Sequence, residues 1–344
     1  AEDKILFVDL LVFPLIEKLA PTLPSLKHIV VLTDTAHMPD TELDVLCYET
    51  LLDEAEADFD WPELNELDAC GLCYTSGTTG NPKGVLYNHR STLLHAMAVN
   101  AADVIGFRNR DAILPVVPMF HVNAWSVPYA ALMAGSKLVF PGPKMGDGEV
   151  LTDLINAESV TIALGVPTVW LGLVQHLQSS GKTVESLERT VVGGSACPVA
   201  IMDTLRNDYG VDTLHAWGMT EMSPIGTINS PPRGFDDLTD EEQSALRAKQ
   251  GRAVFGVEIK ITDDDDNELP HDGEAFGALK VRGPWVCKGY YKLDKSDSHD
   301  AQGWFDTGDV ATIDQYGTMQ ITDRAKDVIK SGGEWISSIE IENI

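Results

Sequence analysis

Basic residues and cysteines are scarce in this sequence of 344 residues. Lys and Arg number 25 against 53 Asp and Glu, which gives a formal net charge of −28 at pH 7. Such an excess of negative charge repels polyanions at long range, so we expect no nucleic-acid partner, and any phosphate site must be local. Five cysteines are too few, and odd in number, for a disulfide framework, which favours a cytoplasmic location.

Long apolar runs are missing as well. The two longest uncharged windows, residues 112–136 and 159–181, contain prolines and polar residues, so neither predicts a transmembrane helix. The sequence begins without Met and has no basic segment followed by an apolar run, as a signal peptide would. It ends within an apolar alternation at residues 340–344, and we expect an internal piece of a longer protein.

The first 250 residues alternate short apolar runs with amphipathic stretches. Residues 4–9 and 28–32 predict strands on either side of a helix in residues 13–23. Further strands are expected at residues 112–117, 137–140, 160–166, 190–194 and 213–216. This βαβ rhythm predicts an α/β fold with a doubly wound parallel sheet over residues 1–250.

Beyond residue 250 the pattern changes. Strand-like runs are separated by Gly and Asp turns with little helical periodicity. This pattern predicts an antiparallel, β-rich subdomain over residues 251–322.

One segment, residues 74–84 (YTSGTTGNPKG), has a composition suited to phosphate. It holds five hydroxyl-bearing side chains, three glycines and one lysine in eleven residues. Glycines let backbone N–H groups turn toward an anion, hydroxyls donate further bonds and a lysine adds a point charge. The segment matches neither the Walker loop nor the GxGxxG fingerprint, and the GxSxG and HExxH patterns are absent from the sequence.

The segment resembles the signature loop of the acyl-adenylate-forming superfamily. Three more stretches match that family in the expected order: AWGMTEMSP (216–224), GWFDTGDVATID (303–314) and DRAKDVIKSGGEWIS (323–337). Within the family, residues 118–125 (PMFHVNAW) and 330–338 (KSGGEWISS) are most similar to fatty acyl-CoA ligases of the medium- and long-chain type. The resemblance implies a large adenylate-forming domain that continues, from residue 323, into a hinge and the start of a small C-terminal α+β domain.

The resemblance also implies an activity, that of an acid–CoA ligase. A carboxylic acid attacks the α-phosphate of ATP, pyrophosphate leaves, and the CoA thiol then displaces AMP, with Mg²⁺ as cofactor. We expect ATP, a medium- or long-chain fatty acid and CoA as the small-molecule substrates. A ligase for 3-methylthiopropionate and a nucleotide-binding regulatory module without catalysis stay open as alternatives. A homodimer is compatible with the sequence.

The family's functional positions are carried over by motif. Nucleotide-binding residues are expected at Thr75, Ser76, Gly77, Thr78, Thr79, Gly80, Lys83, Gly193, Gly194, Ser195, Trp217, Gly218, Met219, Thr220, Asp309 and Arg324. Lys83, His121 and Glu221 are the expected catalytic residues, and Thr78 and Glu221 the expected metal ligands. Trp217 stands where the family usually has Tyr; its indole can still stack on adenine.

Glu221 is also indicated by its surroundings. It is the only charged residue in the stretch 214–228, and a lone carboxylate in an apolar stretch should have a partner. A structural salt bridge is the alternative explanation.

The acyl side and the hinge complete the expected site. His121 and Trp125 are expected to bind the acyl group, and they share one face if residues 122–134 are helical. Asp323, Lys326 and Lys330 mark the hinge. The family's catalytic lysine lies further along than residue 344, so we expect this chain to turn over poorly by itself.

Overall fold

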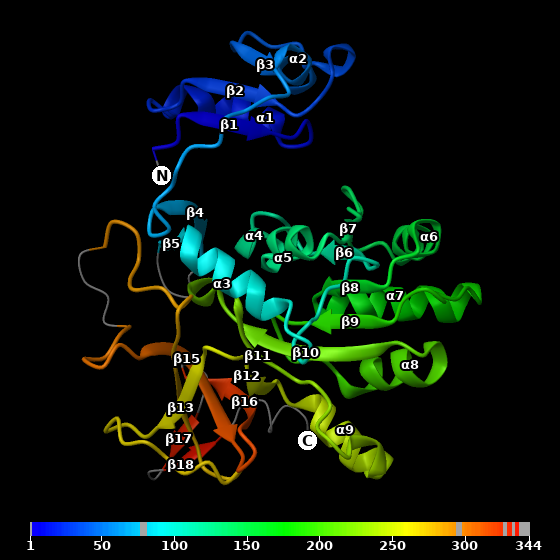
Figure 1. Cartoon of the computed structure of the whole chain (residues 1–344), viewed down its shortest axis with the longest axis vertical. Helices are drawn as coiled ribbons and strands as arrows, with labels where there is room; N and C mark the ends of the chain where they lie inside the picture. The colour runs from blue at the N-terminus through cyan, green and yellow to red at the C-terminus, as the bar shows by residue number, and fades with distance from the viewer. Residues whose placement is uncertain (1, 76–80, 294–297, 326–328, 332–333, 337–344) are drawn as a thin grey trace. The chain divides into compact units, whose positions relative to one another are not determined.

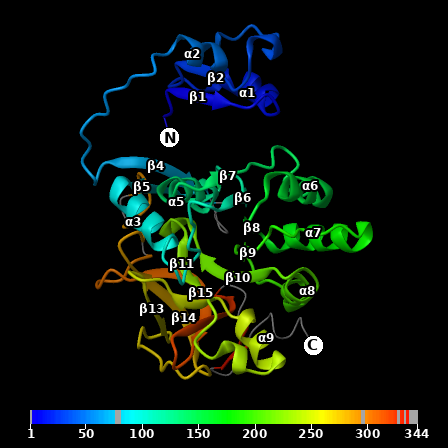
Figure 2. The same ribbon diagram turned by 45° about the vertical axis from the view of Figure 1, so that its right-hand side comes forward.

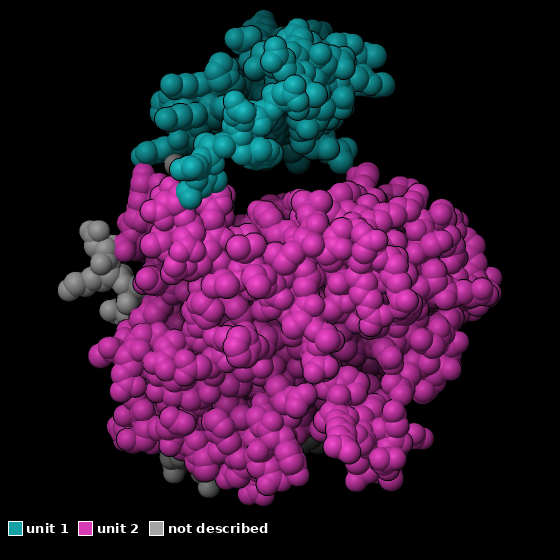
Figure 3. Space-filling view, in the orientation of Figure 1, with its two compact units in different colours: residues 1–64 teal, residues 65–344 magenta. Residues whose placement is uncertain are grey.

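The computed structural model describes residues 2–75, 81–293, 298–325, 329–331 and 334–336. Contacts divide the chain into two compact units, residues 1–64 and 65–344, coloured teal and magenta in Figure 3. Each unit has its own sheet and its own buried core.

The first unit is a small parallel α/β layer. Its strands β1 (Ile5–Val8), β2 (His28–Val31) and β3 (Val45–Cys47) pair in parallel in that order. Between and after them come α1 (Phe13–Leu19), η1 (Ala20–Thr22), η2 (Thr35–His37) and α2 (Tyr48–Glu54). Val8, Phe13, Ile29 and Val31 form its core. The βαβ unit expected over residues 4–32 is confirmed.

The second unit is built on one sheet of eleven strands, whose first half is parallel. In that half the spatial order is β7–β6–β8–β9–β10. The strands are β6 (Ala112–Val116), β7 (Lys137–Leu138), β8 (Ile162–Gly165), β9 (Arg189–Val192) and β10 (Asp212–Gly218). All neighbours in this half run parallel. Such strands are buried on both faces, which explains their continuous apolar runs.

Helices cover both faces of the parallel strands. Ile113 packs with α3 (His89–Val99) and α5 (Val127–Ala134), whereas its neighbour Leu114 packs with the helices of the opposite face. Those helices are α6 (Gly148–Glu158), α7 (Pro167–Ser180) and α8 (Val199–Tyr209), grouped together in Figures 1 and 2. The doubly wound α/β fold is therefore confirmed.

The uncharged windows noted in the sequence form ordinary elements of this layer. Residues 112–136 run from β6 to α5, and residues 159–181 include β8 and α7. Among the described residues, no helix has both the length and the apolar character needed to cross a membrane.

The second half of the sheet is antiparallel. It consists of β11 (Ile225–Ile228), β12 (Gly251–Ala253), β13 (Glu258–Thr262), β14 (Phe276–Arg282), β15 (Phe305–Ile313) and β16 (Thr318–Arg324). The order from β10 is β11–β12–β16–β15–β14–β13. The antiparallel character predicted for residues 251–322 is confirmed, but the sheet runs on across residue 250, and the domain boundaries at residues 250 and 322 stay a prediction.

Several short elements complete the unit. They are the hairpin β4–β5 (Ala69–Tyr74, Gly84–Asn88), the turn α4 (Val122–Trp125), η3 (Thr220–Met222), η4 (Phe235–Asp237), α9 (Asp240–Ala248) and the pair β17–β18 (Ile329–Ser331, Glu334–Ile336). The strand order reverses between β6 and β8, and open α/β sheets bind ligands outside the carboxyl ends of the strands at such points.

Gly251 lies on β12, where this strand pairs with β11 in the antiparallel half. It has φ of +80°, and a Cβ there would lie 2.1 Å from the carbonyl oxygen of Ile228. We expect Gly251→Ala to lower the free energy of unfolding by about 2–4 kcal/mol, because a strained backbone adds to an overlap with main-chain atoms. Urea unfolding would measure the loss.

Gly142→Ala is the matched control. Gly142 has φ of +62° with nothing within 4 Å of an added Cβ. This variant should lose only about 1 kcal/mol, the cost of the left-handed backbone. Equal losses in the two variants would contradict the importance of the β11–β12 contact.

Candidate active site

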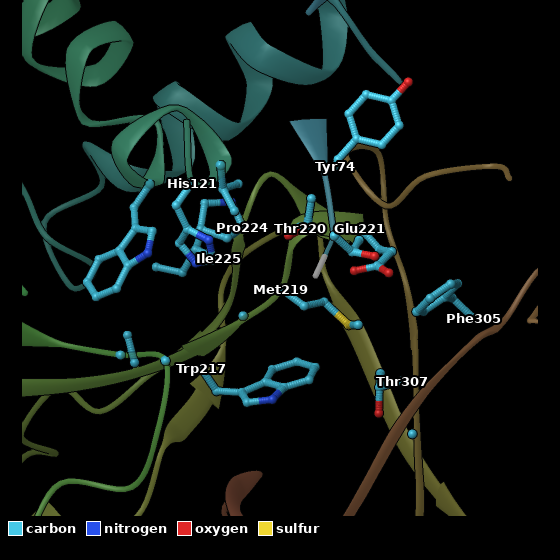
Figure 4. A pocket seen from close by; sticks show the side chains of 18 of the residues that line it. Tyr74, His121, Trp217, Met219, Thr220, Glu221, Pro224, Ile225, Phe305 and Thr307 are labelled. Carbon is cyan, nitrogen blue, oxygen red and sulfur yellow. The ribbon is translucent and has the colours of Figure 1, made fainter. Parts of the chain in front are cut away.

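A cavity of about 850 Å³ opens within the second unit, at the carboxyl ends of the parallel strands. Figure 4 shows His121, Trp217 and Glu221 around this cavity. Its lining extends along the sequence from Tyr74 to Arg324. One cavity therefore brings together residues from all four sequence motifs.

The base of the glycine-rich loop lies at one end of the cavity. The hairpin β4–β5 pairs Tyr74 with Gly84, and the Thr75 N–H donates to the Lys83 carbonyl oxygen at 2.9 Å. Thr75 and Lys83 both line the cavity. The expected residues Ser76, Gly77, Thr78, Thr79 and Gly80 lie outside the described residues.

Glu221 lies in η3, directly after β10, and is 7% exposed. Its Oε1 accepts a hydrogen bond of 2.7 Å from the Tyr290 hydroxyl. Its backbone oxygen accepts from the Cys287 N–H at 2.7 Å. The partner expected for this lone carboxylate is therefore a phenol, and the alternative of a structural salt bridge is not supported among the described residues.

These groups fit a divalent cation shared with a nucleotide. Within the described ranges no cluster of three His, Cys, Asp or Glu side chains could hold a metal ion alone. Mg²⁺ is commonly held by one or two carboxylates together with substrate phosphates and water. Glu221 is a buried carboxylate that lines the cavity and has no cationic partner in the part of the chain that the structure describes, which matches that arrangement.

Asp309 lies on β15 and is 3% exposed; it does not itself line the cavity, although the preceding Thr307 and Gly308 do. Its Oδ2 accepts from the Trp217 indole N–H at 2.9 Å, and its Oδ1 is 2.7 Å from an Arg324 guanidinium nitrogen. Burial raises the pKa of the Asp309 carboxyl, although Arg324 and the indole N–H oppose this. Trp217 therefore has a hydrogen-bonding role besides the expected stacking surface.

The wall of the cavity includes small residues and η3. Gly193 and Gly194 follow β9 and line the cavity, whereas the exposed Ser195 is not part of the lining. From the neighbouring strand, Gly218, Met219 and Thr220 line it as well. A Cβ on Gly218 would lie 2.0 Å from the Pro224 oxygen, so only glycine fits there.

The expected acyl-binding residues both line the cavity, but not as one helical face. Five consecutive residues from Val122 to Ser126 have φ between +49° and +60°, which is left-handed backbone. The right-handed helix α5 begins only at Val127. The condition under which His121 and Trp125 would share one helical face, a helix over residues 122–134, is therefore not met.

Packing holds this left-handed turn in place. The Ser126 hydroxyl donates to the Ser223 carbonyl oxygen at 2.6 Å, and the Cys73 thiol donates to the Asn123 side chain at 3.6 Å. The turn directs Trp125 against the glycine wall, because a Cβ on Gly193 would lie 3.2 Å from its indole ring.

Part of the cavity lining is apolar. It consists of Val99, Ile105, Leu164 and Val191. Leu164 is fully buried and also faces the cavity. Trp170 is fully buried in the core of the parallel layer.

The hinge residues are only partly described. Asp323 and Arg324 end β16, where Asp323 is buried and Arg324 is half exposed. Lys326 lies outside the described residues, and Lys330 belongs to β17.

Three residues around the cavity were not predicted from sequence. The Tyr87 hydroxyl donates to the Thr220 carbonyl oxygen at 2.7 Å, and the fully buried His95 accepts from the Ile225 N–H at 3.0 Å. Burial lowers the pKa of His95 to about 3, so this imidazole is neutral at physiological pH. Tyr290 is the third. Polar side chains within buried elements were the only signal that could have indicated them.

Comparison with known proteins agrees with this geometry. An α/β fold with a cavity outside the carboxyl ends of its parallel strands is typical of ligand-binding α/β proteins. The family model described as AMP-binding enzyme matches residues 1–291. The chain belongs to this family.

Two curated relatives and one solved structure are similar over the whole chain. The 3-methylmercaptopropionyl-CoA ligase of Ruegeria lacuscaerulensis is 52% identical over all of this chain and 64% of its own length. The medium-chain-fatty-acid–CoA ligase of Ectopseudomonas oleovorans is 50% identical over all of this chain and 63% of its own. The crystal structure of the anthranilate CoA ligase AuaEII with anthranoyl-AMP superposes with a TM-score of 0.84 at 27% identity, over 99% of this chain and 62% of that one. The chain therefore spans less than two thirds of the length of these relatives.

The buried charge of Asp309 predicts a pH-dependent stability. The pKa of Asp309 is raised above 3.8 in the folded chain. Between pH 3.8 and this raised value, the folded chain therefore binds more protons than the unfolded chain. The free energy of unfolding falls as the pH rises through this window. Asn has no charge to bury and keeps an acceptor for Trp217. We expect the stability of Asp309→Asn relative to the wild type to increase as the pH rises through this window and then level off.

Urea unfolding midpoints between pH 4 and pH 7 would measure this effect. Glu185→Gln is the control, because Glu185 is an exposed carboxyl that does not line the cavity and is not among the charges acting on Asp309. The prediction would be contradicted if the gain in stability of Asp309→Asn over the wild type were already complete at pH 4, or if the control gained as much stability.

Proposed function

We propose that this chain is the ATP- and acid-binding part of an AMP-forming acid–CoA ligase. The observation that supports it best is the single cavity lined by Lys83, Glu221 and apolar side chains, with Asp309 bonded to the lining residue Trp217. An acyl-adenylate has the same distribution of charged, polar and apolar parts. The first half-reaction would join the carboxylate to the α-phosphate with loss of pyrophosphate, and the second would transfer the acyl group to CoA.

The phosphate end would lower the barrier through charge. Two anions, a carboxylate and a phosphate, must approach in line, so positive charge and positioning matter more than proton transfer. Lys83, with Thr75 and the loop after it, would hold the β- and γ-phosphates, and Glu221 with Thr78 would hold Mg²⁺, which supplies further positive charge. His121 would lie near the reacting carboxylate.

The adenosine end would be held by Asp309, Trp217 and the glycine wall. A carboxylate with two oxygens suits the two ribose hydroxyls. In this chain those oxygens already have fixed directions, because one accepts from Trp217 and the other pairs with Arg324. Gly193 and Gly194 allow the adenine to approach the backbone closely.

We propose a medium- or long-chain fatty acid as the acyl substrate. The apolar lining by Val99, Ile105, Leu164 and Val191 supports an aliphatic chain. The alternative, 3-methylthiopropionate, is favoured by the relative at 52% identity, and a short thioether would also fit apolar walls. A regulatory module that binds nucleotide without catalysis would need neither the apolar lining nor His121. We propose that the protein works in the cytoplasm.

A series of acyl-sulfamoyl-adenosine analogues, unreactive mimics of the adenylate, would test this proposal. We expect their affinity for the chain to rise with acyl length, by about 4-fold per buried CH₂, until the apolar part of the cavity is full. Isothermal titration with acyl groups of three to eighteen carbons, including 3-methylthiopropionyl, would measure the dissociation constants.

Asp309→Ala is the matched variant for this series. It should weaken binding of every analogue by the same factor, because it removes a contact to the shared ribose. An affinity that does not depend on the acyl group would contradict the ligase proposal and favour the regulatory module.

A further inference from the structure

The segment Cys287 to Tyr291 connects the two polar elements of the cavity. The Cys287 N–H donates to the backbone oxygen of Glu221 at 2.7 Å, and the Tyr291 N–H donates to the carbonyl oxygen of Gly84 at 2.8 Å. Gly84 directly follows Lys83. The backbone of this short segment therefore ties η3, which bears Glu221, to the strand that follows the phosphate loop.

Tyr290 stands between these two anchors and touches both charged side chains. Its hydroxyl donates to Glu221 Oε1 at 2.7 Å, and Lys83 Nζ lies 4.8 Å from the centre of its ring. All three side chains line the cavity. A protonated phenol donates one hydrogen bond, and the face of its ring attracts a cation. Tyr290 thus offers each charged group a different part of the same side chain.

This arrangement keeps two opposite charges apart. Lys83 and Glu221 line one cavity, yet no ion pair within 4.0 Å joins them in the part of the chain that the structure describes. A direct ion pair would neutralise both groups and withdraw them from a ligand. The phenol occupies one carboxylate oxygen of Glu221 and leaves Oε2 without a protein hydrogen bond among the described residues.

We propose that Tyr290 is a positioning residue for the divalent cation of the bound nucleotide, which it serves by orienting Glu221 and separating it from Lys83. The inference rests on the proposed binding of ATP with Mg²⁺. Groups that hydrogen-bond to a metal-ligating side chain fix its orientation, and their loss typically weakens metal binding by about 10-fold or more. Tyr290 needs no contact with the metal or the nucleotide for this role.

A purely structural role is the competing explanation. Tyr290 also packs against a small apolar cluster that includes Val85, Tyr87 and Val122. Tyr290→Phe keeps this packing and the aromatic face but removes the hydroxyl. Tyr290→Leu removes the ring as well.

The experiment measures ATP binding by isothermal titration, once with Mg²⁺ and once with EDTA. The dissociation constant in EDTA divided by that with Mg²⁺ gives the metal-dependent part of binding. We expect Tyr290→Phe to reduce this ratio by about 10-fold and to leave the affinity in EDTA unchanged. Tyr290→Leu should, in addition, weaken binding in EDTA by about 2- to 5-fold, because Lys83 loses the ring.

Two further variants show whether Tyr290 acts through Glu221. Glu221→Gln should abolish the metal-dependent part of binding, and adding Tyr290→Phe to it should have no further effect, since the two residues act as one unit. Tyr291→Phe is the matched control, because Tyr291 is the neighbouring tyrosine and does not line the cavity. It should change neither dissociation constant.

Two outcomes in the variants would overturn the inference. They are an unchanged metal-dependent ratio in Tyr290→Phe, including the case of equal losses with Mg²⁺ and EDTA, and a full additional loss in the Glu221→Gln background. A wild-type chain that binds ATP without any effect of Mg²⁺ would overturn it too. Failure of the ligase proposal looks different: ATP binding would still respond to Mg²⁺ and to Tyr290, but acyl length would have no effect.

Discussion

The change from parallel to antiparallel pairing after β10 is the constraint on which the rest of this structure depends. Strand β10 runs parallel to β9, and β11 returns antiparallel to β10, so the chain must reverse between Gly218 and Ile225. The close approach of Gly218 to the Pro224 oxygen makes the reversal tight, and Glu221, within the reversal, lines the cavity. Because β11 then pairs with β12, and β12 with β16, the same turn fixes how Asp309 and Arg324 meet the parallel half.

Two buried acids serve this cavity with different kinds of partner. The carboxylate of Asp309 lies between an indole N–H and a guanidinium, whereas the carboxylate of Glu221 accepts from a phenol. The backbone oxygen of Glu221 accepts separately from a backbone N–H. A strong cationic partner makes a carboxylate a rigid acceptor with little remaining negative charge. A neutral partner leaves the charge of Glu221 available to a ligand. The difference matches the proposed tasks of holding hydroxyl groups and holding a metal ion.

The local sequence pattern was sufficient to predict most strands of the parallel layer and one residue of the site. Apolar runs such as residues 112–117 identify strands because parallel strands are buried on both faces, and Glu221 stands out as a lone charge in an apolar stretch. Contacts between distant residues could not be predicted. Trp217 and Asp309 are 92 residues apart, and Tyr290 and Glu221 are 69 apart. The left-handed turn at residues 122–126 could not be predicted either, because its sequence has no glycine and packing alone imposes this backbone conformation.

The wide separation in sequence of the residues around the cavity affects how the protein assembles. Its lining comes from segments between Tyr74 and Arg324, so loops spanning most of the second unit must close before a complete binding surface exists, and such long-range closure is slow. A partly folded chain lacks that surface. A nucleotide bound there stabilises the fully assembled unit by mass action, and its affinity reports whether the whole unit has folded rather than any single element.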